Sequence, residues 1–154
     1  MKKFNLLFYI IIFILNFKNT YSEKISIIYT VDNEPITNVQ INNEITYLKL
    51  INKNLDTMED NSLVVYASKS LLREKIKEVE ISKYFKFGLN DELVFQNMEN
   101  LYRSIGLTNQ DEFDNLLKNL NLNKKFIKKK IEIELLWNRL IYEKFENKLS
   151  INKD

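Results

Sequence analysis

Carboxylates are the side chains of this sequence best suited to acid–base chemistry. There are 21 Asp and Glu residues and no His, and Cys is absent too. These absences exclude an imidazole base, a thiolate nucleophile and a zinc site of the usual kind. Two carboxylates could act together, as they do in glycosidases. The acids at helical spacing are, however, interpreted as solvated polar faces: Glu74, Glu78, Glu80, Glu132 and Glu134.

Phosphate chemistry is also disfavoured, because the chain has only two glycines, Gly88 and Gly106. A loop that cradles phosphates needs several glycines close together. We therefore predict a protein that is not an enzyme, with no metal and no cofactor.

One basic run occupies residues 124–130, which contain five lysines. Such a run could meet anionic lipid headgroups or an acidic partner. The favoured interpretation is a solvated helix face, with Lys128 paired to Glu132 and Lys130 to Glu134, each four residues further on.

Aromatic side chains gather around residues 84–87 and again along 137–145. Aromatic anchors offer large contact area and tolerate varied partner sequences. These residues could fill the core where two helices cross, line a groove for an unfolded polypeptide, or do both. The candidate peptide-binding residues are Tyr84, Phe85, Phe87, Trp137, Tyr142 and Phe145.

The N-terminal residues 1–22 have the pattern of a secretory signal peptide. Two lysines follow Met1, an apolar run extends from Leu6 to Leu15, and a polar stretch ends at Ser22, after which we expect cleavage. A membrane-spanning helix needs roughly 20 apolar residues. The sequence thus predicts an exported, periplasmic protein, tethered to the membrane only if this peptide stays uncut.

Cleavage would change the charge of the chain. Removing Lys2, Lys3 and Lys18 from the 23 basic residues leaves 20, against 21 acidic ones. A nucleic-acid binder needs a clustered positive surface. No nucleic-acid partner is therefore expected.

The elements that position these side chains begin with a predicted β-hairpin. Residues 25–31 alternate as a strand with one buried face, formed by Ile25, Ile27, Tyr29 and Val31. A turn at Asp32-Asn33 leads to a second extended piece, 34–36.

Five helices are expected after the hairpin. A capping box of Thr37 with Gln40 opens the first helix, and Ile36 and Ile41 form its hydrophobic staple. Gly88 is expected as the left-handed residue that ends the second helix, at Phe87. The expected ranges are 37–53, 62–87, 91–104, 109–120 and 124–148, with a polar loop over 54–61.

Two helix faces are predicted to form core. On the second helix the apolar stripe is read as Leu72, Ile76 and Val79, widened by Ile81, Tyr84 and Phe85. The last helix is apolar on most sides between Ile131 and Phe145. A helix of that kind is buried by its neighbours or by a partner, so we expect it at the centre of the bundle.

This order of elements resembles the N-terminal domain of SurA-type periplasmic chaperones and peptidyl-prolyl isomerases. The resemblance covers about Ile25 to Phe145. The segments that carry it are 28–37 (IYTVDNEPIT), 71–76 (LLREKI) running to Phe87-Gly88-Leu89, 90–93 (NDEL), 106–108 (GLT) leading to Glu112-Phe113, and 131–141 (IEIELLWNRLI).

The resemblance implies a periplasmic chaperone that holds unfolded outer-membrane proteins through weak, sequence-tolerant contacts. The isomerase domains of that family use histidines, which this chain lacks, so only the holding function is carried over. In that family a C-terminal segment also completes this domain, so such a segment, or a second copy of the chain, is a possible partner. The expected fold is mainly α, a five-helix bundle after a short β-hairpin, over residues 23–149, with a tail at 150–154.

Two alternatives stay open. The chain could be the front fragment of a peptidyl-prolyl isomerase whose parvulin domain is missing. It could also be a structural interaction domain that pairs with one folded partner through the hairpin edge and the last helix.

Overall fold

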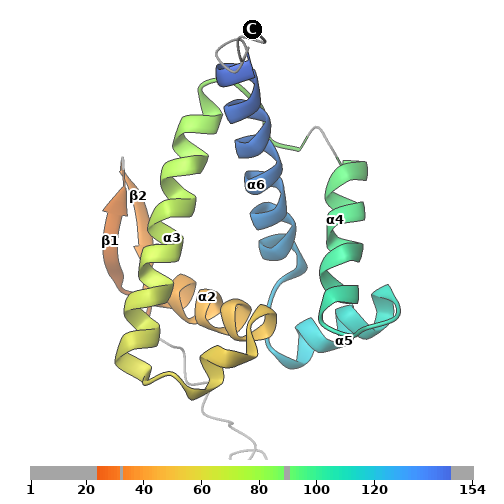
Figure 1. The fold of residues 1–154 in the computed structure, drawn as a ribbon. Helices are drawn as coiled ribbons and strands as arrows, with labels where there is room; N and C mark the ends of the chain where they lie inside the picture. Colours follow the sequence, from red (N-terminus) through yellow and green to blue (C-terminus); the bar gives the residue numbers. More distant parts are fainter. Residues whose placement is uncertain (1–23, 32, 89–90, 147–154) are drawn as a thin grey trace, which may run out of the picture.

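Two long helices, α3 (Asp60–Ser82) and α6 (Lys124–Phe145), frame the computed structural model, which describes residues 24–31, 33–88 and 91–146 (Figure 1). They converge at one end of the molecule, and α2 (Asn38–Ile51) crosses at the other end. The helices α4 (Asp91–Ser104) and α5 (Gln110–Asn119) form an arm beyond α6. The predicted fold class, mainly α with an N-terminal hairpin, is confirmed. The predicted signal peptide, its cleavage site and the tail lie outside the described residues.

The hairpin pairs β1 (Ile27–Val31) with β2 (Glu34–Thr37), antiparallel. The predicted buried face of β1 is wrong, because Ile27 is 65% exposed and Tyr29 51% exposed. Figure 1 shows the reason: β2 lies between β1 and α3, so β1 is the outer strand. Only Val31, at the turn end of β1, packs against the core.

Helix α2 begins as predicted. Thr37 is its N-cap, and both hydrogen bonds of the capping box with Gln40 are present. Ile36 and Ile41, the two staple positions, are both buried in one cluster. The segment predicted as a polar loop contains a short 3-10 helix, η1 (Lys53–Thr57), whose Leu55 is buried.

Helix α3 differs most from expectation, because it ends at Ser82 and not at Phe87. Gly88 does have a positive φ, +85°, but it lies in the connection after the helix. Phe85 and Phe87 both pack on the cluster that α3 and α6 share. Residues two apart on a helix point about 200° apart. A continuous helix could therefore not bring both rings to α6.

The core stripe predicted for this helix is wrong for Leu72 and Ile76, which are exposed, and right for Ile81, which is buried. The helix buries a different face against α2 and the hairpin, and Ile81 joins α6. Its buried apolar residues are Leu63, Ala67, Leu71 and Ile81.

The ends of the shorter helices follow local sequence signals. Gly106, with φ +88°, terminates α4, and the Leu107 N–H donates to the Tyr102 carbonyl at 3.0 Å, as in a Schellman ending. Asn121, with φ +54°, ends α5 in the same way, and the Leu122 N–H donates to the Leu117 carbonyl at 2.9 Å. Asn109 and Asn123 cap the starts of α5 and α6 with their side chains.

The apolar core is divided into three clusters. One joins α2, α3 and the hairpin around Leu63, and a second joins α2, α4, α5 and the start of α6 around Phe113. The third lies between α3 and α6 around Ile133. Helix α6 belongs to two of them and runs between α3 and α4, which confirms its central place (Figure 1). No helix within the described ranges is long and apolar enough to cross a bilayer.

Candidate functional site

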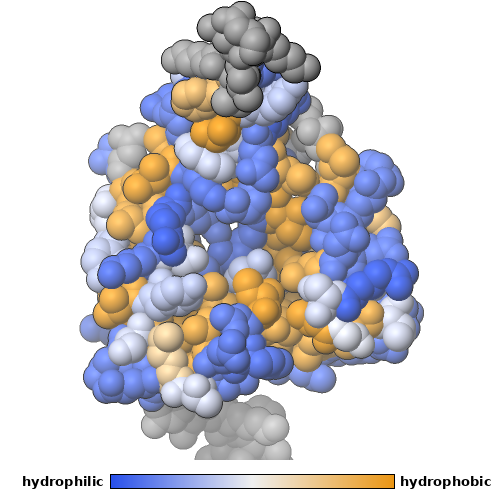
Figure 2. All heavy atoms as spheres, viewed as in Figure 1, coloured by the Kyte–Doolittle hydropathy of each residue, from blue (hydrophilic) through white to orange (hydrophobic). Residues whose placement is uncertain are grey.

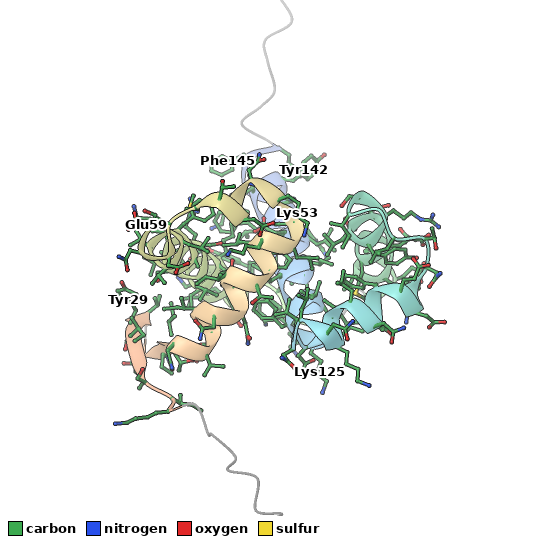
Figure 3. All side chains as sticks on the ribbon, turned by 90° about the horizontal axis from the view of Figure 1, so that it is seen from below. Tyr29, Lys53, Glu59, Lys125, Tyr142 and Phe145 are labelled. Carbon is green, nitrogen blue, oxygen red and sulfur yellow. The ribbon has the colours of Figure 1, made fainter. Side chains whose placement is uncertain are left out.

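The six predicted binding residues do not form one group, because Phe87 lies beside Lys129 near the start of α6, whereas Tyr142 and Phe145 lie at its other end. They also differ in burial. Phe85, Phe87 and Trp137 are half-buried against the third cluster. Tyr84, Phe145 and Tyr142 are exposed, Tyr142 to 66%. In Figure 3, Tyr142 and Phe145 project from the end of α6, on the other side of the molecule from Lys125. These six residues thus contribute to both core and surface.

Cationic side chains lie over four of these rings, and Lys77 Nζ is 5.8 Å from the centre of the Trp137 ring. Lys129 Nζ is 3.3 Å from the centre of the Phe87 ring, and Lys144 Nζ is 4.4 Å from that of Tyr84. Arg139 covers Phe85 at 4.8 Å. Cation–π contacts of this kind orient a ring and cover one of its faces.

An apolar groove of about 460 Å³ runs between the upper halves of α3 and α6. Of the predicted residues, Trp137 and Phe145 line it, whereas Tyr84, Phe85, Phe87 and Tyr142 do not. Sequence reasoning assigned Ile76 and Val79 to the core, so their place here was missed. The apolar lining comprises Val31, Ile76, Val79, Trp137, Leu140, Ile141 and Phe145.

Charged groups form the rim of the apolar groove. Glu80 pairs with Lys83 at 2.7 Å and with Lys144 at 2.9 Å. The hydrogen bonds from Lys83 and Lys144 lower the pKa of the Glu80 carboxyl below its ordinary value. The rim therefore stays ionised and hydrated around an apolar floor.

A second site, polar in character, lies between α2, α3 and α6. Lys130, only 7% exposed, reaches the fully buried Glu44, with Nζ 2.5 Å from Oε2, and also contacts Glu74. The interpretation of Lys130 as part of a solvated face is therefore wrong. Its predicted partner Glu134 instead accepts from Lys77, at 2.6 and 2.7 Å.

The prediction that the acids are solvated is also wrong for Glu74 and Glu78, which are partly buried. Glu78 pairs with Lys75 at 3.0 Å and with Lys129 at 2.9 Å. Lys129 and Lys130 of α6 thus pair with acids of α2 and α3, whereas Lys124 pairs with Asp114 of α5 at 2.7 Å. Pairing within α6 would have left Glu44 without a counter-ion.

Burial shapes the electrostatics of this polar site. Burial raises the pKa of the Glu74 carboxyl above its ordinary value, although the Lys130 ammonium opposes this effect. Burial, followed by the charges of Glu44 and Glu74, raises the pKa of Tyr47 to about 12. The rings of Tyr47 and Phe126 lie 4.9 and 5.1 Å from Lys130 Nζ. The ammonium is therefore held by carboxylates and aromatic rings together.

A polar cavity of about 430 Å³ opens beside this cluster. Figure 2 shows that face of the molecule hollowed between α3 and α6, with hydrophilic residues in its depth. Glu44 lines the cavity, and neither of its carboxylate oxygens has a hydrogen-bond partner among the described residues. A buried carboxylate oxygen normally accepts hydrogen bonds.

Sequence reasoning missed this cluster, although one signal was present. Glu44 lies three residues after Ile41 and four before Leu48, which places a carboxylate on the apolar stripe of α2. Lys130 likewise lies three residues from both Ile127 and Ile133. A charge on an apolar stripe indicates a buried ion pair or a site. No group of three or more potential ligand side chains in the described segments is arranged to hold a metal ion.

Comparisons with known proteins gave no match to a family model, a curated protein or a solved structure.

Proposed function

We propose that the protein is an exported chaperone module of SurA type that holds unfolded outer-membrane proteins without catalysing a reaction. The observation that carries this proposal is the apolar groove. Its floor presents Ile76, Ile141 and Phe145 to solvent at one end of the molecule. Apolar surface that is gathered in one place indicates a binding site more strongly than single exposed residues do.

The chemistry of the groove suits weak and unselective holding. Its lining is aliphatic and aromatic, so it distinguishes side chains by apolarity and size more than by hydrogen bonds. Each apolar side chain that a client buries contributes about 1.5–3 kcal/mol. Ordering the client chain offsets part of that gain. Contacts of this strength allow release, as a holding function requires.

The charged rim supports the same interpretation. Glu80 pairs with both Lys83 and Lys144, so both signs of charge are present. Such a rim adds little attraction for either a basic or an acidic client. Selection would therefore depend on the apolar floor, and many sequences would be accepted.

An aggregation assay tests the proposal. A urea-unfolded β-barrel protein is diluted into buffer with residues 23–154 of this chain, which contain every described element. Light scattering should fall at near-equimolar amounts. The double variant Ile76→Ser, Ile141→Ser should protect much less, whereas Leu93→Ser, at an exposed apolar position of α4 outside the groove, should protect as the parent does. Absence of protection, or equal losses in both variants, would contradict the proposal.

A second candidate function, a structural interaction domain, is favoured by the outer strand. Ile25, Ile27 and Ile28 are exposed along or next to β1, which is an edge strand. Edge strands can pair with a strand of another chain. A stable dimer in light scattering, together with no client protection, would favour this function over the first.

A further inference from the structure

The buried ion cluster has an excess of negative charge. Glu44 and Glu74 contribute two carboxylates, and Lys130 is the cation that contacts both of them. Glu44 is fully buried, so water cannot screen its charge. A buried charge that is not fully compensated is costly. An additional positive group would balance the cluster.

The geometry leaves a place for that group. The Lys130 ammonium lies 2.5 Å from Oε2 of Glu44, and neither oxygen of that carboxylate has a hydrogen-bond partner among the described residues. Glu44, Glu74 and Tyr47 all line the polar cavity, whose volume of about 430 Å³ lies within the range of small-ligand pockets. The cavity therefore offers an unpaired, buried acceptor beside an aromatic residue.

The other charged residues of the lining do not supply the missing cation. Lys77 donates to both oxygens of Glu134 at 2.6 and 2.7 Å, so its charge is already paired. Arg73 is exposed to solvent at the lining, where water screens it. Aliphatic walls from Leu48, Ile51 and Leu135 leave room for a short hydrocarbon stem.

We propose that the polar cavity binds an organic cation, an alkylammonium or guanidinium group on a short apolar stem, with Glu44 Oε1 as its hydrogen-bond acceptor. Carboxylates supply the counter-charge, and Tyr47 adds an aromatic surface that favours cations. The same chemistry is present in a free small amine and in the side chain of a Lys or Arg residue of a bound polypeptide. This proposal does not depend on the chaperone function, because the polar cavity and the apolar groove have different linings.

Titration of the full expressed chain tests the proposal. The probes are n-butylammonium and methylguanidinium, with butanoate and n-butanol as controls of opposite and zero charge. Calorimetry should show saturable binding of the two cations and none of the controls. Amide signals of residues 44–48 and 130–135 should shift in NMR spectra. No saturable binding of either cation, or equal binding of n-butanol, would overturn the proposal.

Two variants locate the site. Glu44→Gln removes the acceptor charge and leaves Lys130 with Glu74, so the protein should stay folded while its affinity for n-butylammonium falls about tenfold or more. Asn138→Trp should block the cavity from an exposed position of its lining, whereas Asn100→Trp, exposed on α4 and outside the cavity, should bind as the parent does. Unchanged affinity in Asn138→Trp would overturn the assignment even if Glu44→Gln did not fold.

A further arm separates the two sources of the cation. A capped Ala-Lys-Ala peptide is compared with the same peptide carrying norleucine in place of lysine. Binding of the lysine peptide alone supports a polypeptide side chain as the ligand. Binding of n-butylammonium without either peptide supports a free small amine. Binding of both peptides with equal affinity would contradict recognition of the cation.

Discussion

The ammonium nitrogen of Lys130 lies 2.5 Å from Oε2 of Glu44, and both side chains are almost entirely removed from water. Lys130 lies on α6 and Glu44 on α2, and no backbone hydrogen bond between described residues joins these two helices. Two charges in such a place are stable only as partners. The pair therefore fixes the position of α6 over α2 more strictly than apolar contacts would.

Replacing Lys130 by Met should destabilise the protein strongly. The substitution leaves Glu44 and Glu74 buried without their cation, and breaking a buried pair in this way costs about 3–5 kcal/mol. Urea unfolding followed by circular dichroism measures the loss. Lys128→Met, two positions away and outside the cluster, is the control, and its effect should be small. Equal effects of the two substitutions would show that the cluster does not hold α6.

The raised pKa of Glu74 predicts a pH dependence of stability with a definite sign. Burial, opposed by Lys130, raises that pKa above 4.5. The folded protein then binds more protons than the unfolded chain between 4.5 and the raised value, so Glu74 makes folding less favourable as the pH rises through that window. Relative to Glu74→Gln, the parent should therefore gain stability as the pH falls toward 4.5. A pH series of urea midpoints tests this expectation.

Glu78→Gln is the matched control for that series, because the sign is reversed. Burial raises the pKa of Glu78, but the hydrogen bonds from Lys129 and Lys75 outweigh burial and place it below 4.5. Glu78 thus contributes stability that is present above 4.5 and is lost as the pH falls through the lowered value. The parent should lose stability relative to Glu78→Gln on acidification. The same trend for both variants would refute the assignment.

Gly106→Ala should destabilise the protein by about 1–2 kcal/mol, because an L-residue with a side chain rarely adopts a left-handed backbone. Gly106 has φ +88°, and no atom lies within 4 Å of an added Cβ. The free-energy cost therefore comes from the backbone conformation of the residue itself and not from a clash with a neighbouring residue. Gly106→Asn should cost less, since Asn33 and Asn121 already adopt positive φ in this protein. Thermal unfolding of both variants gives the order, and an alanine variant as stable as the parent would contradict it.

Trp137 is the one tryptophan of the chain, and it lines the apolar groove. Binding of an unfolded β-barrel fragment that has no tryptophan should therefore shift the fluorescence of Trp137 to shorter wavelength. The bound client displaces water from the indole ring. The shift should saturate with the fragment and be weaker in Ile141→Ser. Leu93→Ser should respond as the parent does. A fluorescence spectrum that the fragment leaves unchanged would argue against binding in this groove.

Several helix ends could be predicted from the sequence because they depend on a few adjacent residues, although the end of α3 at Ser82 was not among them. The capping box of Thr37 with Gln40 needs only one turn of helix, and the Gly106 ending only the last turn of α4. The outward face of α3 could not be predicted in the same way. Leu71 and Leu72 are adjacent and equally apolar. Leu71 is buried and Leu72 is exposed because α2 and the hairpin pack against only one side of the helix.

The two candidate sites differ in how far the sequence predicts them. Aromatic composition indicated the neighbourhood of the apolar groove, and Trp137 and Phe145 do line it. The polar cavity depends on pairings between distant segments, and the rule that favours partners four residues apart assigned Lys130 to the wrong acid. Its contact with Glu44 exists only because three helices converge at one point.

The division of the core has a consequence for the order in which the protein assembles. A chain made from its N-terminus folds its early segments first. Helices α2 and α3 can form their shared cluster at that stage, since all its buried residues come before Leu72. Glu44 then still lacks Lys130, which arrives with the last helix. The early half would have to keep this carboxylate hydrated until α6 docks, so the arrival of the last helix is the step that removes Glu44 from water.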